Sequence, residues 1–210
     1  MGYHLFSFGI NTEKLKSVFG SKNQKTFELV KNSEIFEGYR DIDDMIEKDQ
    51  ITIETALKDI INGEILNQKS GYVYGYAVIS LCATLGETLP YEQEIKLGYE
   101  TDFIDKYFQE DFKKKSFSIE KTILVQNESP FKLPPIVDWP LIGFLSYSDL
   151  IKLQEKFKNI RITDSEIEEL QDSDDEDEED KGFAYAHIQG IIANIDYCVE
   201  NNLDLITFCH

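Results

Sequence analysis

The sequence predicts an α+β fold that is mostly helical, with a small sheet that includes the N-terminal and C-terminal strands. Apolar residues between positions 184 and 198 recur at steps of three and four, as on one face of an α-helix. Residues 205–208 then have the β-branched and aromatic content of a strand. At the other end, residues 3–8 form a short aromatic stretch that Gly9 ends, which is also typical of a strand. Both ends of the chain are therefore expected inside the core.

Between these ends, most segments have helical periodicity. The segment 71–85 is apolar on every side, which indicates a buried central helix, and we expect the helix at 184–198 to pack against it. Asn, Thr or Ser caps and Gly stops frame most of the other segments. Helices are expected at 12–19, 40–62 and 101–112 and after residues 21, 146 and 163, and strands are expected at 117–125 and 141–145.

We predict a single domain that covers residues 1–210. No internal repeat and no shift in composition marks a boundary inside the chain. Asp and Glu occupy eight of the nine positions from 172 to 180. Because like charges at this density repel each other, residues 172–181 are predicted to be a solvated, flexible acidic loop within the domain.

Composition excludes several classes of partner. Forty acidic residues against 21 basic ones give a formal net charge of -19, which repels nucleic acid and anionic membranes and favours a basic protein partner. No apolar run is long enough to span a membrane, and the first residues do not have the pattern of a signal peptide. Three dispersed cysteines without a CxxC pair favour a reducing compartment, so a cytoplasmic location is expected.

The acidic run and the single tryptophan are the candidate partner-binding residues. The run does not fit an EF-hand, because Asp177 stands where the calcium loop needs Gly and Phe183 where it needs Glu. A dense negative charge can instead recognise a basic protein. Trp139 lies among prolines, where it either packs onto the core or serves as an exposed aromatic anchor. The residues assigned are Asp172, Asp174, Asp175, Glu176, Asp177, Glu178, Glu179, Asp180 and Trp139.

No catalytic, cofactor-binding or metal-ligating residue is assigned. His4, His187 and His210 are few and dispersed along the sequence, and none belongs to an HExxH motif. Nucleophile-elbow, P-loop and dinucleotide-binding patterns are absent from the sequence. A dyad of Cys82 or Cys198 with His187 remains open on residue type alone.

Short segments spread along the chain carry a resemblance to a known family. They are residues 2–8, Gly20-Ser21, Pro134-Pro135, Asp138 with Pro140, Ile142 and Gly143, and residues 204–208. The chain resembles an uncharacterised bacterial family of acidic cytoplasmic proteins that is described as a domain of unknown function. In general character it is also similar to the immunity proteins of toxin systems. The resemblance implies no activity.

The sequence leads to two functional hypotheses, one for a binding protein and one for an enzyme. The favoured one is a non-enzymatic, acidic protein-binding protein, immunity-like or regulatory, that engages a basic protein partner. The alternative is a small-molecule enzyme whose carboxylate and histidine groups come together only in three dimensions. A pocket with convergent polar groups of shifted pKa would favour the enzyme, and a broad negative surface would favour the binding protein.

Overall fold

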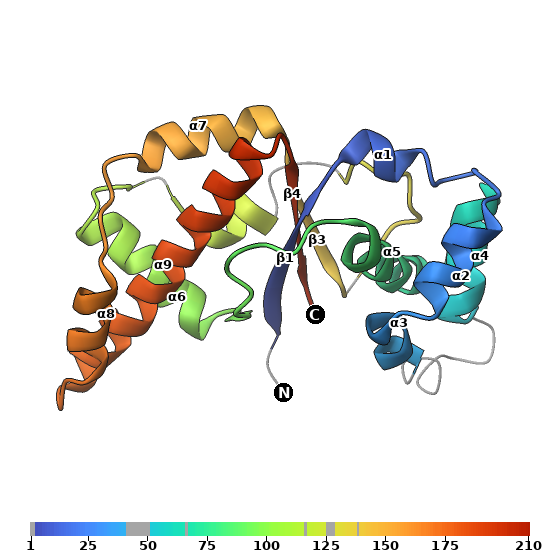
Figure 1. Cartoon of the computed structure of the whole chain (residues 1–210). Helices are drawn as coiled ribbons and strands as arrows, with labels where there is room; N and C mark the ends of the chain where they lie inside the picture. The colour runs from blue at the N-terminus through green and yellow to red at the C-terminus, as the bar shows by residue number, and fades with distance from the viewer. Residues whose placement is uncertain (1–2, 41–50, 66, 116, 125–128, 138) are drawn as a thin grey trace.

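A four-stranded antiparallel sheet divides the molecule into two helical halves (Figure 1). The computed structural model describes residues 3–40, 51–65, 67–115, 117–124, 129–137 and 139–210. The strands are β1 (His4–Ile10), β2 (Ile95–Lys96), β3 (Leu141–Leu145) and β4 (Asp204–Cys209), and their order in the sheet is β2-β1-β4-β3. The first and last strands are therefore central neighbours. This confirms the predicted α+β class and the predicted strands at both ends.

The pairing of β1 with β4 gives each face of the sheet its own core. Phe6 pairs with Phe208 and Phe8 with Ile206, so these side chains share one face. Leu5 and Leu205 belong to the core on the opposite face. The two faces are both apolar because each is covered by helices.

The first half of the chain supplies the helices on one face. They are α1 (Thr12–Lys16), α2 (Gln24–Lys31), α3 (Glu34–Tyr39), α4 (Ile53–Asn62) and α5 (Gly71–Leu85). As predicted, α5 is a buried helix, and it packs with α4, α3 and β1. The predicted helix at 40–62 is present as α4, and residues 41–50 of that prediction lie outside the described residues.

The second half covers the other face with α6 (Tyr99–Glu110), α7 (Tyr147–Phe157), α8 (Asp164–Gln171) and α9 (Glu176–Glu200). Here α9 packs against α6, α7 and α8. The expectation that α9 packs against α5 is wrong, because the sheet lies between them and each helix buries its apolar side on its own face (Figure 1).

Two further local predictions need correction. The predicted strand at 117–125 contains a π-helical turn, η2 (Glu120–Leu124), which packs under β3 and β4 with Ile123 and Leu124 buried. The predicted acidic loop at 172–181 is mostly helix, because α9 already begins at Glu176. Asp175 caps that helix by accepting a hydrogen bond from the Asp177 N–H at 2.9 Å. Acidic side chains in the first turn are stabilised by the helix dipole.

Candidate functional site

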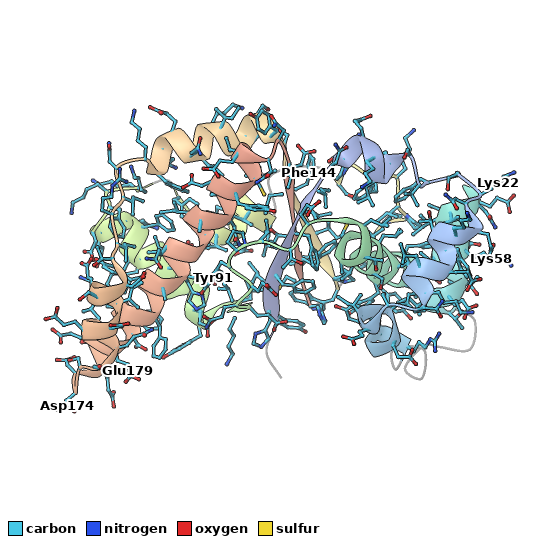
Figure 2. All side chains as sticks on the ribbon, viewed as in Figure 1. Lys22, Lys58, Tyr91, Phe144, Asp174 and Glu179 are labelled. Atoms are coloured by element: carbon cyan, nitrogen blue, oxygen red, sulfur yellow. The ribbon has the colours of Figure 1, made fainter. Side chains whose placement is uncertain are left out.

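The acidic run lies at the tip formed by α8 and α9 (Figure 2). Asp172 follows α8, Asp174 and Asp175 lie in the turn, and the remaining acids occupy the first turns of α9. All eight acidic side chains except that of Asp180 are exposed, and Asp180 is half-buried. Because α9 continues from this tip into the core, the negative charge is held on a rigid element.

Part of the run lines a groove of about 500 Å³ between α6 and α9. Glu176, Glu179 and Asp180 line it from α9, and Glu100 lines it from α6. Three aromatic rings complete the lining, those of Tyr99, Phe103 and Phe183, together with Gln93, Ala184 and His187. Among the described residues, no Lys or Arg lines this groove. The other acids of the run, Asp172, Asp174, Asp175, Asp177 and Glu178, do not line it.

Two of the rings in the groove are unusually exposed. Tyr99 is 58% exposed and Phe183 is 45% exposed. The Tyr99 hydroxyl donates a hydrogen bond to Asp180 Oδ1 at 3.3 Å, and the charge of Asp180 raises the pKa of this tyrosine. The groove therefore combines carboxylates with aromatic faces, and both attract cations.

Trp139 does not take part in this groove. Its ring stacks on that of Tyr3, with centroids 3.7 Å apart and an angle of 16° between the planes. It is half-buried and packs against the core on the α9 side of the sheet, just before β3. The structure thus brings three of the predicted acids together with Glu100 and leaves Trp139 elsewhere.

Beside the groove, His187 joins α9 to α6 and to the segment 87–94, which we call the strap. The Tyr91 hydroxyl lies 2.7 Å from His187 Nδ1, and Glu100 Oε2 lies 3.4 Å from His187 Nε2. Glu100 also accepts a hydrogen bond from the Lys96 N–H at 2.6 Å. The strap is anchored a second time, because the Asn194 side-chain amide pairs with both backbone groups of Tyr91 at 2.9 Å.

Two of the residues in these contacts, His187 and Tyr91, are neutral at neutral pH. Burial lowers the pKa of His187, and the charge of Glu100 opposes that shift. Burial raises the pKa of the Tyr91 phenol. Neutral His187 can donate its Nε2–H to Glu100 while Nδ1 accepts the Tyr91 O–H, since Nδ1 at 2.7 Å is nearer to that hydroxyl than the competing acceptor Gln93 Oε1 at 3.2 Å. Both ring nitrogens of His187 then have polar partners, so the main effect of the contacts from Glu100 through His187 to Tyr91 is to fix the strap in place.

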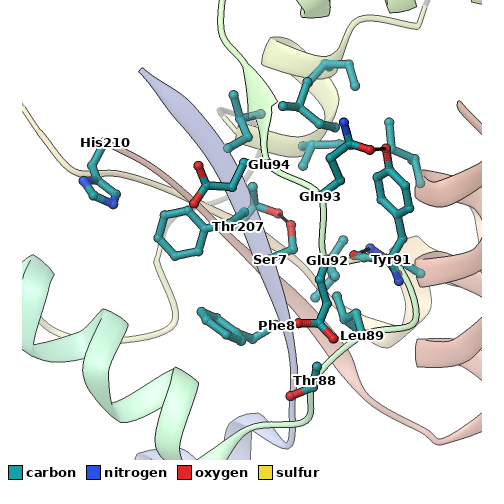
Figure 3. Close-up of a pocket in the computed structure, with 18 of the residues that line it drawn as sticks. Ser7, Phe8, Thr88, Leu89, Tyr91, Glu92, Gln93, Glu94, Thr207 and His210 are labelled. Carbon is teal, nitrogen blue, oxygen red and sulfur yellow. Dashed lines mark hydrogen bonds between the residues drawn. The ribbon is translucent and has the colours of Figure 1, made fainter. Parts of the chain in front are cut away.

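The strap covers a cavity of about 240 Å³ at the edge of the sheet (Figure 3). Ser7 and Thr207 line it from the central strands, and their hydroxyls lie 2.7 Å apart. Glu92 and Glu94 line it from the strap. His210 and Tyr39 line its other side, with Tyr39 OH 3.1 Å from His210 Nε2.

The histidines are less dispersed in space than in the sequence. His4 and His210 are paired across β1 and β4 through two backbone hydrogen bonds of 3.0 and 3.2 Å. His4 Nδ1 lies 3.7 Å from Glu94 Oε2. Within the described parts of the chain, no group of three or more His, Cys, Asp or Glu side chains has the arrangement of a metal site.

The cysteines do not form a dyad with a histidine. Cys82, Cys198 and Cys209 are all free and buried. Burial raises the pKa of Cys198 to about 12 and that of Cys209 to about 11, so both stay protonated at neutral pH. Cys82 lies in the core of the α5 face, on the other side of the sheet from His187.

Comparison with known proteins gives one match. A family model described as "Domain of unknown function (DUF7691)" matches residues 1–210. The chain belongs to the DUF7691 family. No curated protein and no solved structure matches it. None of the helices described for this DUF7691 chain is both long and apolar enough to cross a membrane.

Sequence reasoning missed most of the polar residues that organise the site in the DUF7691 chain. Asn194 is a polar residue outside the apolar face predicted between positions 184 and 198, yet it is buried against the strap. Gly190 is the residue whose identity could have indicated that another segment approaches α9 closely. A Cβ there would overlap the Tyr91 ring, and only glycine leaves room for it. His187, Gly190 and Asn194 follow at steps of three and four, which places them on one helix face.

Proposed function

We propose that this DUF7691 protein is a non-enzymatic, immunity-like or regulatory binding protein of the bacterial cytoplasm, and that it holds a basic segment of a protein partner in the groove between α6 and α9. One observation carries the proposal. Glu100, Glu176, Glu179 and Asp180 line a single groove without any Lys or Arg among its described lining residues. The formal net charge of -19 adds a long-range attraction for a basic partner. The free, buried thiols are compatible with a reducing compartment.

Arginine is the side chain that this lining suits best. Its planar guanidinium can pair with a carboxylate through two hydrogen bonds and can stack on an aromatic face. Tyr99 and Phe183 provide exposed rings beside Asp180 and Glu179 in the groove. A partner segment with two or more arginines would therefore meet both kinds of contact at once. Charge on the rest of the tip would accelerate its approach.

A small-molecule enzyme is the second candidate. The line from Glu100 through His187 to Tyr91 favours it, because a carboxylate and a histidine converge beside a cavity. Burial weighs against it, because it lowers the pKa of His187 and so weakens the imidazole as a base, and both ring nitrogens already have polar partners. Turnover of ester or phosphate monoester substrates that His187→Gln abolishes while the variant stays folded would favour the enzyme.

Two variants with the same charge change separate the groove from the charge of the tip. The groove variant carries Glu176→Gln, Glu179→Gln and Asp180→Asn. The control carries Asp172→Asn, Asp174→Asn and Asp177→Asn, which are exposed positions outside the groove lining. The probe is a fluorescein-labelled octa-arginine peptide, and its binding is measured by fluorescence anisotropy at two ionic strengths.

The groove variant is expected to bind the peptide roughly tenfold more weakly than the unmodified protein, and the control only a few-fold more weakly. The salt dependence should flatten in both variants, because exposed charges are screened over a Debye length of about 8–10 Å. Equal losses in the two variants would show that the peptide responds to overall charge and would refute the groove as the site. A partner captured from the native cell can then be tested with the same pair of variants.

A further inference from the structure

The cavity beneath the strap has a lining that differs from that of the groove. Four rings from β1, α3 and the chain end surround one part of it, those of Phe6, Phe8, Tyr39 and His210. The planes of Phe6 and Phe8 meet at 81°, those of Phe6 and His210 at 86°, and those of Tyr39 and His210 at 74°. Edge-to-face contacts of this kind are a preferred packing of aromatic rings. The four rings, which we call the ring box, therefore form one aromatic wall of the cavity. All four are half-buried.

Carboxylates stand at the mouth of this box. Glu92 and Glu94 are exposed on the strap and line the cavity, and Figure 3 shows Glu94 on the same side of the strap as Phe8 and His210. Among the described residues, no Lys or Arg lines the cavity. Burial lowers the pKa of His210 and raises that of Tyr39, so both groups are neutral at neutral pH and neither repels a cation.

The cavity continues past β1 to a pair of hydroxyls. Thr207 is 2% exposed, and its Oγ1 lies 2.7 Å from Ser7 Oγ. Two hydroxyls carry two hydrogens, and their mutual hydrogen bond uses only one. Within the described residues, neither hydroxyl is shown with a second partner, so one O–H is left to donate to a group inside the cavity.

We propose that this cavity is a binding site for a small organic cation with an alkylated ammonium group, and that the ring box and the two carboxylates of the strap hold its positive end. Aromatic faces attract an alkylated ammonium through their quadrupoles, and the methyl groups reduce the cost of removing the cation from water. Ser7 and Thr207 lie on the opposite face of the sheet from the rings, so their free O–H can donate only to a part of the ligand that reaches past the edge of β1. A volume of about 240 Å³ suits a molecule of that size. The cavity adjoins the groove, because Gln93 lines both, but none of the rings and carboxylates assigned to the cation lines the groove, so this site does not depend on the proposed partner.

The test compares choline with 3,3-dimethylbutan-1-ol, which has the same shape and hydroxyl but no charge. Binding to the full chain is measured by isothermal titration calorimetry at low ionic strength. Choline is expected to bind at least tenfold more tightly than the neutral analogue, the size expected of cation–π attraction in a partly desolvated site. Equal binding of the two compounds, or binding of neither, would overturn the proposal.

Variants of the strap then locate the cation. Glu92→Gln with Glu94→Gln is expected to weaken choline binding roughly tenfold, because it removes both carboxylates at the mouth. Glu87→Gln is the control, since Glu87 is an exposed acid of the same strap outside the cavity lining, and it should leave the affinity within about twofold. Phe8→Leu tests the ring box separately. Choline binding that survives in both the double variant and Phe8→Leu would place the cation elsewhere and refute the site.

Discussion

Replacing Asn194 with Ala should remove one of the two anchors that hold the strap to α9 and so loosen it. The Asn194 side chain accepts a hydrogen bond from the Tyr91 N–H and donates one to the Tyr91 carbonyl oxygen, both at 2.9 Å. Each such bond contributes about 0.5–1.5 kcal/mol net to stability, so losing two costs about 1–3 kcal/mol. In a protein of this size, 1 kcal/mol corresponds to roughly 2–4 °C in the melting temperature. The expected decrease in melting temperature is therefore about 2–12 °C.

The assay combines thermal unfolding followed by circular dichroism with hydrogen exchange at the Tyr91 amide. Exchange at that amide should accelerate more than exchange in the core strands, because the strap opens before the whole molecule unfolds. Glu200→Ala is the control, since Glu200 is exposed near the end of the same helix and its removal should change the melting temperature little. An Asn194→Ala protein with an unchanged melting temperature and a still-protected Tyr91 amide would refute the reasoning.

Two further predictions concern glycine packing and pH. Gly143→Ala should destabilise the fold by about 1–3 kcal/mol or more in urea unfolding, because a Cβ there would overlap the Ile123 backbone oxygen. Gly38→Ala is its control, where a Cβ meets nothing, and unchanged or greater stability is expected there, so equal losses would contradict the packing argument. Burial lowers the pKa of both His187 and His210 below 6.5, so the unfolded state binds more protons as pH falls through 6.5. The free energy of unfolding measured in urea titrations should therefore decrease between pH 7 and about pH 5. If the slope of this free energy against pH is unchanged in His187→Gln, His187 is excluded as a source of the effect.

The parts of the fold that could be predicted are those with a local cause. Periodicity and caps located α5, α7 and α9, since the apolar spacing of a helix is visible in its own residues. The two-residue strand β2 and the π-helical turn η2 have no such pattern, because their shape comes from the sheet edge and from packing beneath β3. The incorrect prediction that α9 packs against α5 also concerns packing that local sequence does not determine. An apolar helix face indicates burial but not which surface covers it.

Of the candidate site, only its negative charge could be predicted from the sequence. The acidic run indicated where negative residues gather, but only the packing of α6 against α9 shows that Glu100 joins Glu176 and Glu179 across one groove. The contact between Tyr91 and His187 spans 96 positions in the chain. Nothing in the sequence near either residue points to the other. Trp139 lies apart from the acidic run, and the binding role of each stays a prediction.

The central pairing of β1 with β4 has a consequence for how this protein is made. Ser7 and Thr207 are 200 positions apart, although their hydroxyls are in contact. At a synthesis rate of about 5–20 residues per second, β1 waits roughly 10–40 s for its partner strand. During that interval the helices of the first half can assemble, but Phe6, Phe8 and the apolar side of α5 face a sheet that is still incomplete. Nascent chains of this protein should therefore be substrates for chaperones that bind apolar segments until β4 is added.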